Sequence, residues 1–392
     1  MPGRLQTHSK LNWGNTLTAA HWRLVKLARN FSRRYALAGL LLSALLQLTV
    51  SAAGETSQPS VKQRLVIAGQ GFFPVALLLQ DGRIAVVLRS GADHVGIKGR
   101  LDMVFSEDGK TWSKPVLVAD SPFDDRNPAF GQAKDGTLVV GFWRSAKDSY
   151  KDYERDDPAQ PVSTWVTRST DGGRTWSDPS EIDVRDIGYG SPYGKMLTLP
   201  DGMMLMNIYG YEVREPGEKT AAKEDHSYLY SSSDHGMIWR RHALIGRKFN
   251  ETGLLRLPDG TLLAAMRSAG DKANVSLTRS VDGGGNWSEP QSVSPPMAHP
   301  ADLTLLGDGR VLLVTGYRAE PFGVRGAIGE KSGAFDGTKS FRLVGDSTNV
   351  DTGYPSSVVL ADGRVLTFYY AVGSKTQPQW GVHCGVVEYR AP

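Results

Sequence analysis

The chain of 392 residues has a single cysteine, Cys384, and its eight histidines are scattered. One thiol excludes an internal disulfide framework and a cysteine-rich zinc site. The scattered histidines predict no metal-ligand triad, so we expect neither a metal nor another cofactor. Long apolar stretches of helical spacing are missing after residue 60, whereas 44 glycines and 21 prolines favour many turns. The composition therefore indicates an all-β protein.

Acidic side chains are missing from residues 1–53, which carry seven Lys and Arg. The rest of the chain holds 38 Lys and Arg against 41 Asp and Glu, a formal net charge of −3. Long basic runs are absent from this larger part. Because phosphate binding requires clustered positive charge, we expect no nucleic-acid partner.

Residues 1–54 have the order of a signal peptide: a basic stretch, an apolar run and small residues. Arg33 and Arg34 precede the apolar residues 35–50, and Ser51-Ala52-Ala53 offers a cleavage site. The apolar run is shorter than the roughly 20 residues of a membrane-spanning helix. We predict export to the periplasm or the extracellular space, with no membrane span in the mature chain. The general secretory route, the twin-arginine route and an uncleaved anchor remain alternatives.

Six Asp-Gly pairs, each between two short apolar runs, repeat through residues 55–392. Asp-Gly supplies the positive φ angles of two-residue hairpin turns. Consecutive glycines lie 54, 66, 58, 49 and 54 residues apart, and a period near 50 that contains strands indicates propeller blades. We predict one domain, an all-β six-bladed β-propeller of four-stranded antiparallel blades. The pairs are Asp81-Gly82, Asp135-Gly136, Asp201-Gly202, Asp259-Gly260, Asp308-Gly309 and Asp362-Gly363.

A second repeat, Ser-x-Asp-x-Gly-x-x-Trp or a close variant, alternates with the first. An Asp accepts hydrogen bonds from turn amides, a Gly takes the left-handed conformation, and a Trp packs over the blade. Copies lie at 106–112, 169–176, 232–239 and 280–287, with a degenerate fifth at 329–336. They resemble the Asp-box of bacterial neuraminidase repeats. The β-like segments 64–67 and 382–389 are candidates for closing the ring.

Together these repeats and several motifs resemble the sialidase (neuraminidase) superfamily over about residues 64–390. The resemblance implies that Tyr354 is the nucleophile, that Glu251 polarises its hydroxyl, and that Arg267 binds a substrate carboxylate. Pro355 departs from the family pattern and leaves the register open by one residue. A neutral phenol suits a sugar whose anomeric carbon carries a carboxylate, because a charged nucleophile would be repelled. A phenol has a pKa of about 10, so it requires an adjacent base.

The loop after the first hairpin contains Asp93, which the resemblance implies is the general acid and base. Its rival Asp102 lies on the following strand and has a structural interpretation. His94 is a second candidate for proton transfer or for lining the pocket.

The resemblance also implies three arginines, because guanidinium groups pair bidentately with a carboxylate. The first is missing, since Phe73 or a neighbour occupies its position. Arg126 is a candidate replacement, or else it pairs with a neighbouring aspartate. Arg318 and Arg325 are alternatives for the third.

Five polar residues occupy equivalent positions, each 8 to 10 residues before the Asp of a hairpin turn. Blade symmetry would gather them at one mouth of the central channel, where His299 would also meet substrate. They are Arg126, Ser191, Glu251, His299 and Tyr354.

We therefore predict a retaining, exo-α-sialidase-like glycoside hydrolase that releases terminal sialic acid from glycans. One alternative is a glycosidase for another acidic sugar, because the first-blade arginine is missing. The other is a carbohydrate-binding propeller without catalytic activity. The sequence makes no prediction of oligomeric state.

Overall fold

The computed structural model describes residues 58–148, 162–211, 224–270 and 272–392. The chain divides into two units, Met1–Ala53 and Gly54–Pro392, and every described residue belongs to the second. The predicted signal segment 1–54 thus lies outside the described residues, and export remains a prediction.

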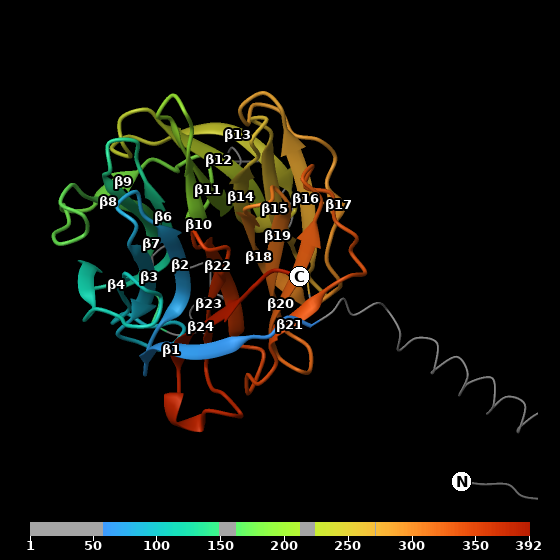
Figure 1. The fold of residues 1–392 in the computed structure, drawn as a ribbon. Helices are drawn as coiled ribbons and strands as arrows, with labels where there is room; N and C mark the ends of the chain where they lie inside the picture. The colour runs from blue at the N-terminus through green and yellow to red at the C-terminus, as the bar shows by residue number, and fades with distance from the viewer. Residues whose placement is uncertain (1–57, 149–161, 212–223, 271) are drawn as a thin grey trace, which may run out of the picture. The chain divides into compact units, whose positions relative to one another are not determined.

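The second unit is built from short strands arranged around a common centre (Figure 1). One 3-10 helix, Pro378–Trp380, is the sole helix among the described residues. One sheet contains β2 (Phe72–Leu78), β3 (Ile84–Ser90), β4 (Arg100–Ser106) and β5 (Val116–Ala119). Another contains β14 (Phe249–Arg256), β15 (Leu262–Ser268), β16 (Val275–Ser280) and β17 (Gln291–Ser292). A third contains β18 (Ala298–Leu305), β19 (Val311–Tyr317), β20 (Gly323–Gly329) and β21 (Phe341–Val344).

The fourth sheet joins the two ends of the unit, in the order β1 (Lys62–Ala68), β24 (His383–Tyr389), β23 (Val365–Ala371) and β22 (Thr352–Val359). The fifth sheet has eight strands. One half is β6 (Asp124–Gln132), β7 (Leu138–Ser145), β8 (Val162–Ser169) and β9 (Ser180–Ile182). The other half is β10 (Ser191–Thr198), β11 (Met204–Gly210), β12 (His226–Ser232) and β13 (Arg240–Arg247).

The predicted number of six separate four-stranded blades is therefore corrected. Four sheets are separate and four-stranded, while the other eight strands form one continuous sheet. The cause is a short parallel contact between the inner strands β6 and β10, which pairs Ala129 with Gly194 and Phe130 with Lys195. The all-β, propeller-like arrangement of four-stranded units is as the repeats predicted.

The six Asp-Gly pairs form the predicted hairpin turns. Each glycine has a positive φ, between 79° and 98°. In every turn the Asp carboxylate accepts a hydrogen bond from the backbone amide two residues later, at 2.9–3.0 Å. The Asp thus stabilises the turn and the Gly allows its backbone conformation, which explains why both residue types recur.

The Asp-boxes are turns of a second kind, on the side of each unit away from its first strand. In the second copy, Asp171 accepts hydrogen bonds from the amides of Arg174 and Thr175 at 2.9 and 3.0 Å. Hydrogen bonds from Thr175, above all, hold the pKa of Asp171 well below its usual range. The carboxylate is thus committed to the turn, which supports a structural role for these boxes.

The Asp-box glycines pack against the neighbouring unit. A Cβ added at any of five equivalent glycines would come within 2.8 Å of a side chain there, and the degenerate fifth copy shares this contact through Gly333. Because these glycines also have positive φ angles, the repeat requires Gly for two reasons. The contacts are Gly109 with Leu366, Gly173 with Phe105, Gly236 with Val139, Gly284 with Leu229, and Gly333 with Leu263.

Variants at Gly283 and Gly284 distinguish the effect of the positive φ angle from that of the close contact. Both have positive φ, but a Cβ at Gly283 would meet nothing within 4 Å, whereas one at Gly284 would lie 2.4 Å from Leu229 Cδ2. We expect Gly284→Ala to lower the free energy of unfolding by about 1–3 kcal/mol more than Gly283→Ala, because it also overpacks a buried contact. Urea unfolding of the two variants measures the difference. Equal losses would show that backbone conformation alone requires these glycines.

The first and last strands of the unit pair with each other. β1 is antiparallel to β24, with Arg64 opposite Val386, and Arg64 forms an ion pair with Glu388 at 2.8 Å. The segments 64–67 and 382–389 therefore close the arrangement, as the sequence predicted. No helix of the described residues is long and apolar enough to cross a membrane.

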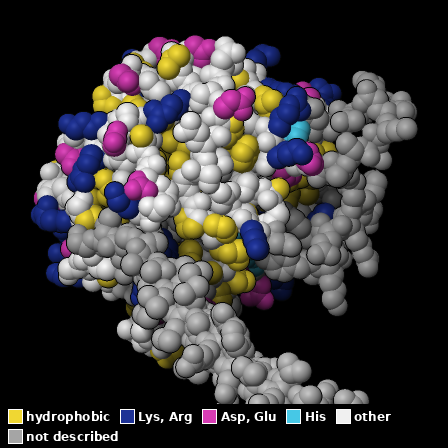
Figure 2. All heavy atoms as spheres, turned by 90° about the vertical axis from the view of Figure 1, so that its right-hand side faces the viewer, with side chains coloured by type: hydrophobic (Ala, Val, Ile, Leu, Met, Phe, Trp, Pro, Cys, Tyr) yellow, Lys and Arg dark blue, Asp and Glu magenta, His cyan; other side chains and the backbone are white. Residues whose placement is uncertain are grey.

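Cationic and anionic side chains are interspersed over the described part of the face shown in Figure 2. This distribution agrees with the nearly balanced charge of residues 54–392. The absence of a nucleic-acid partner remains a prediction.

Candidate functional site

The first strand of each four-stranded unit carries an irregularity at the same place. Its pairing with the next strand shifts register in all six cases. At three of these bulges a non-glycine residue has a positive φ and precedes a proline: Phe73 (53°), Asn127 (49°) and Tyr354 (47°). Pro355, which departs from the family pattern, is therefore part of a feature that this chain repeats. Bulges redirect side chains, and such backbone outliers cluster at functional sites.

Tyr354, Glu251 and Arg267, from β22, β14 and β15, meet at the centre of the unit. The Tyr354 hydroxyl donates a hydrogen bond to Glu251 Oε1, and Arg267 Nη1 donates to Oε2 of the same carboxylate at 2.6 Å. Tyr354 and Glu251 are buried. The structure thus brings together an acid, a phenol and a guanidinium that are up to 103 residues apart.

The electrostatics of this group keep the phenol neutral. Burial, followed by the nearby Glu251 carboxylate, raises the pKa of Tyr354 well above its usual range. Burial opposes the charge of Arg267, but the Glu251 carboxylate raises the pKa of Arg267 on balance. Both the phenol proton and the positive charge are therefore retained at neutral pH, and Glu251 is positioned to accept the phenol proton.

Arg318 lies over the ring of Tyr354, with its guanidinium carbon 5.7 Å from the ring centroid. Within the described part of the chain, its Nε and Nη2 atoms are buried without a hydrogen-bond partner, as is Nε of Arg267. Burial, then the charges of Arg267 and Arg318, lowers the pKa of His299 to about 2, so this imidazole is neutral. Unpaired buried donors on cationic groups are suited to an anion, because leaving them unsatisfied is costly.

Arg126 pairs with a neighbouring aspartate and also lies close to the aromatic rings around Tyr354. Its guanidinium carbon lies 5.5 Å from the ring centroid of Phe73 and 5.6 Å from that of Trp143. Its Nη1 also donates a hydrogen bond to Asp124 at 3.5 Å. Since the Phe73 and Tyr354 ring centroids are 4.8 Å apart, Arg126 belongs to the same cluster as the phenol.

The loop of residues 91–99 brings His94 to this cluster, whereas no hydrogen bond or ion pair joins the Asp93 side chain to the cluster among the described residues. Asp93 is exposed. His94 Nδ1 lies 2.8 Å from Asp351 Oδ1, and its ring packs edge-on against Phe73 at 4.9 Å between centroids. Burial lowers the pKa of His94, although Asp351 opposes the shift. The rival Asp102 is buried on β4, where Ser90 donates a hydrogen bond to it, and this favours its structural interpretation.

The prediction of Arg325 as a candidate for the third arginine is corrected, because Arg325 lies outside the cluster around Tyr354. Its guanidinium carbon stacks 3.9 Å from the ring centroid of Tyr317, and Nη1 donates a hydrogen bond to Ser340 at 3.5 Å. It lines a separate cavity beside Val293 and Thr315. Arg325 belongs to β20, the third strand of its sheet, whereas Arg318 directly follows the second, β19, and faces Tyr354. Of the two candidates, only Arg318 joins the cluster.

Two further residues, Asp351 and Tyr370, belong to the cluster although the sequence analysis did not predict them as site residues. Asp351 accepts hydrogen bonds from the Tyr370 hydroxyl at 2.6 Å and contacts His94, so it joins the loop 91–99 to β23. Its position three residues before Tyr354 was the available signal. The ring of Tyr370 lies 5.6 Å from that of Tyr354 between centroids, and its hydroxyl holds Asp351.

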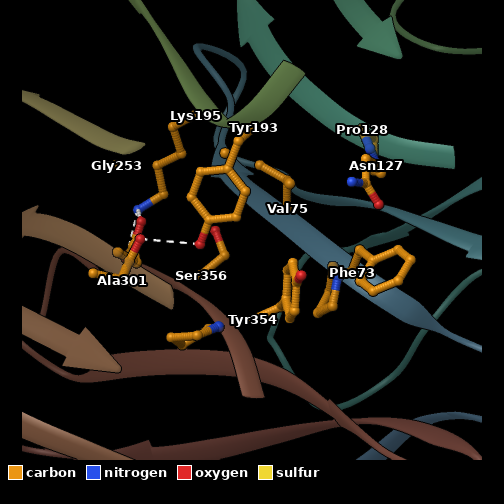
Figure 3. A pocket seen from close by; sticks show the side chains of 14 residues that line it. Phe73, Val75, Asn127, Pro128, Tyr193, Lys195, Gly253, Ala301, Tyr354 and Ser356 are labelled. Carbon is orange, nitrogen blue, oxygen red and sulfur yellow. Dashed lines mark hydrogen bonds and ion pairs between the residues drawn. The ribbon is translucent and has the colours of Figure 1, made fainter. Parts of the chain in front are cut away.

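Tyr354 lines a small pocket together with Phe73, Tyr193 and Lys195 (Figure 3). Its cavity volume is about 10 Å³, roughly enough for one water molecule. Tyr193 donates a hydrogen bond to the Ala301 carbonyl at 3.0 Å. Lys195 pairs with Asp302 at 2.9 Å and donates to the Ser357 carbonyl at 2.6 Å. The polar cluster is therefore closed on this side.

The comparisons with known proteins agree with this architecture. The family model described as "BNR repeat-like domain" matches residues 82–367. A sialidase of Micromonospora viridifaciens is 25% identical in an alignment of 293 positions that covers 66% of this chain and 45% of that protein. The chain thus spans less than half the length of this curated relative.

Solved structures show the same fold. A protein of unknown function from Dyadobacter fermentans superposes with a TM-score of 0.72 at 26% identity, over 85% of this chain and 100% of that chain. The Hadza microbial sialidase Hz136 superposes with a TM-score of 0.65 at 16% identity, over 82% of this chain and 66% of that chain.

Proposed function

Because the chain belongs to the BNR repeat-like domain family of the sialidase superfamily, we propose that it is a retaining glycoside hydrolase that releases terminal sialic acid from glycans. The observation that carries this proposal is the buried contact of Tyr354 with Glu251, whose second oxygen is held by Arg267 at 2.6 Å. A neutral phenol beside a base, under unpaired cationic donors, suits a substrate with an anionic reacting centre.

The proposed reaction has two steps. Tyr354 Oη attacks the anomeric carbon while Glu251 accepts its proton, and Asp93 gives a proton to the departing glycosidic oxygen. Asp93 then removes a proton from water, which attacks the anomeric carbon of the tyrosyl intermediate and releases the sugar with retained configuration. Glu251 returns its proton to Tyr354 Oη, which restores the hydroxyl. Every step uses only side chains, substrate and water.

Arg318, Arg267 and Arg126 are proposed to hold the substrate carboxylate. We expect Arg318→Met to raise KM about 10- to 100-fold, with a smaller change in kcat, because charged hydrogen bonds contribute about 1.5–3 kcal/mol each. Initial rates over a range of substrate concentrations provide the measurement. Arg325→Met is the control, because its guanidinium stacks on Tyr317 instead. Equal effects of the two variants would contradict the assignment of Arg318.

Phe73 favours a second candidate, hydrolysis of another acidic sugar. It occupies the position of the first clamp arginine, is buried, and lies 4.8 Å from Tyr354 between ring centroids. An aromatic ring there replaces one carboxylate contact with an apolar surface, which alters the sugar that fits. A panel of fluorogenic α-sialosides and β-uronides tests both candidates. Turnover of sialosides supports the first, turnover of uronides alone supports the second, and binding without turnover supports a non-catalytic lectin.

Three further parts of the prediction belong to this proposal. Residues 55–392 form a single propeller-like domain, in which the halves β6–β9 and β10–β13 of the eight-stranded sheet each repeat the hairpin and Asp-box pattern. Residues 1–54 are a cleaved signal peptide, and the enzyme works in the periplasm or outside the cell. Mass spectrometry of the purified protein tests the cleavage, because an intact segment would contradict it.

A further inference from the structure

We propose that Arg89 and Asp124, a buried ion pair next to the candidate site, are positioning residues that fix the loop of residues 91–99 and thereby the place of Asp93. This inference rests on the proposed function, because it assigns Asp93 the proton transfer described above. Neither side chain is exposed at all, so neither can touch a substrate. Their effect on the reaction must therefore pass through the residues that they hold.

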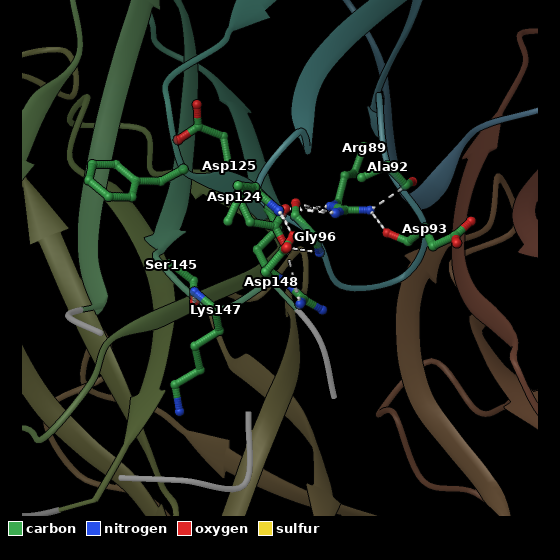
Figure 4. A network of polar contacts seen from close by, with 12 residues as sticks. Arg89, Ala92, Asp93, Gly96, Asp124, Asp125, Ser145, Lys147 and Asp148 are labelled. Atoms are coloured by element: carbon green, nitrogen blue, oxygen red, sulfur yellow. Dashed lines mark hydrogen bonds and ion pairs between the residues drawn. The ribbon is translucent and has the colours of Figure 1, made fainter. Parts of the chain in front are cut away.

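Arg89 lies at the base of the loop and binds its backbone (Figure 4). Its Nη1 donates hydrogen bonds to the carbonyls of Ala92, at 3.2 Å, and of Asp93. Its Nη2 donates to the carbonyl of Gly96 at 3.3 Å. One guanidinium thus holds three carbonyl groups spread over five residues of the loop, and the rigid fork of arginine suits this task better than a flexible ammonium group.

Asp124, on β6, completes the anchor from the neighbouring sheet. Its Oδ1 accepts a hydrogen bond from Arg89 Nε at 2.8 Å, and its Oδ2 accepts one from the Gly96 amide at 3.1 Å. The fit is close, because a Cβ added at Gly99 would lie 1.9 Å from Asp124 Oδ1. The loop therefore encloses the ion pair, and the pair orients both a carbonyl and an amide of Gly96.

The same carboxylate connects the loop to the arginine cluster. Asp124 Oδ2 accepts a hydrogen bond from Arg126 Nη1 at 3.5 Å as well as from Gly96. A change at Asp124 would therefore disturb both the loop and the guanidinium that stacks on Phe73. Within the stretch that Arg89 binds, His94 is held by Asp351 at 2.8 Å.

Asp93 directly precedes His94, and Arg89 binds its backbone. Its carbonyl faces Arg89, whereas its side chain is exposed and points away from the ion pair (Figure 4). A carboxylate that must reach a departing oxygen needs its backbone held in place, since small displacements of a catalytic group lower the rate strongly. The buried pair supplies this restraint without occupying the site.

Asp125→Asn provides a matched control for Asp124→Asn. Asp125 is the next residue on β6, its side chain is equally buried, and it pairs with Arg144 Nε at 2.8 Å. The Asp125 amide donates a hydrogen bond to the Gly99 carbonyl at 2.9 Å, which Asp125→Asn retains. No hydrogen bond runs from the Asp125 carboxylate to the loop among the described residues. The two variants therefore remove similar charges, but only one removes the anchor of the loop.

The first test compares substrates with good and poor leaving groups. An aryl glycoside departs without a proton, whereas a sugar leaving group requires the general acid. We expect Asp124→Asn to lower kcat/KM for sialyllactose at least about 10-fold more than for the corresponding 4-nitrophenyl sialoside. Asp125→Asn should change the two values equally. Equal losses for both substrates in Asp124→Asn would overturn the proposal, because a merely structural defect lowers both alike.

The second test follows the loop itself and needs no activity. Amide hydrogen exchange of peptides covering residues 92–99 should be at least about 10-fold faster in Asp124→Asn than in wild type, and unchanged in Asp125→Asn. Unchanged exchange in Asp124→Asn would overturn the anchoring. Wild-type protein that hydrolyses neither sialosides nor other acidic glycosides would instead refute the proposed function, while the exchange rates still decide whether the pair holds the loop.

Discussion

Replacement of Tyr354 by phenylalanine is expected to lower kcat by about 10³- to 10⁶-fold, the range for loss of a group that reacts directly with substrate. The change removes the hydroxyl that donates to Glu251 and leaves the ring. Ring packing against Phe73 at 4.8 Å and Tyr370 at 5.6 Å remains, so KM should change little, whereas loss of the hydrogen bond to the buried Glu251 carboxylate should lower the free energy of unfolding by about 1–3 kcal/mol. Single-turnover measurements with an aryl sialoside separate this chemical step from product release.

Tyr389→Phe is the control for the loss of a buried tyrosine hydroxyl. The Tyr389 hydroxyl lies 3.0 Å from Thr367 Oγ1 in a core cluster that does not include Tyr354. Its loss should lower stability modestly and leave turnover unchanged. If Tyr354→Phe hydrolysed the substrate as fast as wild type, Tyr354 would be excluded as the nucleophile and the cluster would have to act by another mechanism.

Glu251→Gln should have the second largest effect, a fall in kcat of about 10²- to 10⁴-fold, typical of a lost general base. The amide keeps the shape of the carboxylate but cannot accept the phenol proton. It also leaves Arg267 without its ionic partner, so we expect the free energy of unfolding to fall by about 1–3 kcal/mol. Activity and urea unfolding, measured on the same preparation, separate the two consequences.

Glu388→Gln is the control for this variant, because it removes the same charge at a distance from the site. Glu388 pairs with Arg64 at 2.8 Å and with Arg364 at 3.2 Å, where β1 and β24 meet. It should lose stability and keep its turnover. A comparable loss of activity in both variants would mean that Glu251 acts through stability rather than as a base.

Most of the fold could be predicted from the two repeats, because each repeat is stabilised by contacts between residues that are close in the sequence. Each Asp-Gly turn is stabilised by a contact between an Asp and an amide two residues later, so a short window contains the whole explanation. The same holds for the Asp-box, where Ser169 and Thr175 bind Asp171. The contact between β6 and β10 could not be predicted, since it depends on how closely two inner strands approach.

The candidate site was predictable only in part, for a related reason. Glu251 and Arg267 face each other across one hairpin, and the family pattern pointed to both. Asp351 and Arg89 carry no local motif, because their partners His94 and Asp124 lie on other parts of the chain. Arg325 was a reasonable alternative to Arg318 by spacing alone. The choice depended on strand position, which the sequence leaves open over a few residues.

The roles of Tyr354, Glu251 and Asp93 remain predictions until turnover is measured. What the structure adds is a reason for Pro355. A residue with positive φ is followed by a proline at Phe73, Asn127 and Tyr354. The backbone at Tyr354 therefore adopts the same kind of bulge as the two other first strands. Pro355, which departs from the family pattern, thus belongs to a feature that recurs within this chain.

Translation delivers β1 and its partner β24, which are neighbours in one sheet, far apart in time. β1 leaves the ribosome early, whereas its partner β24 is the last strand described, and 324 residues separate Arg64 from Glu388. Until β24 emerges, β1 has no partner and β23 has an open edge, and such edges promote aggregation. Contacts of this sequence separation also form slowly. A chain that lacks β24 is thus expected to need chaperone protection, and cooperative folding of this unit should begin only once β24 has emerged from the ribosome.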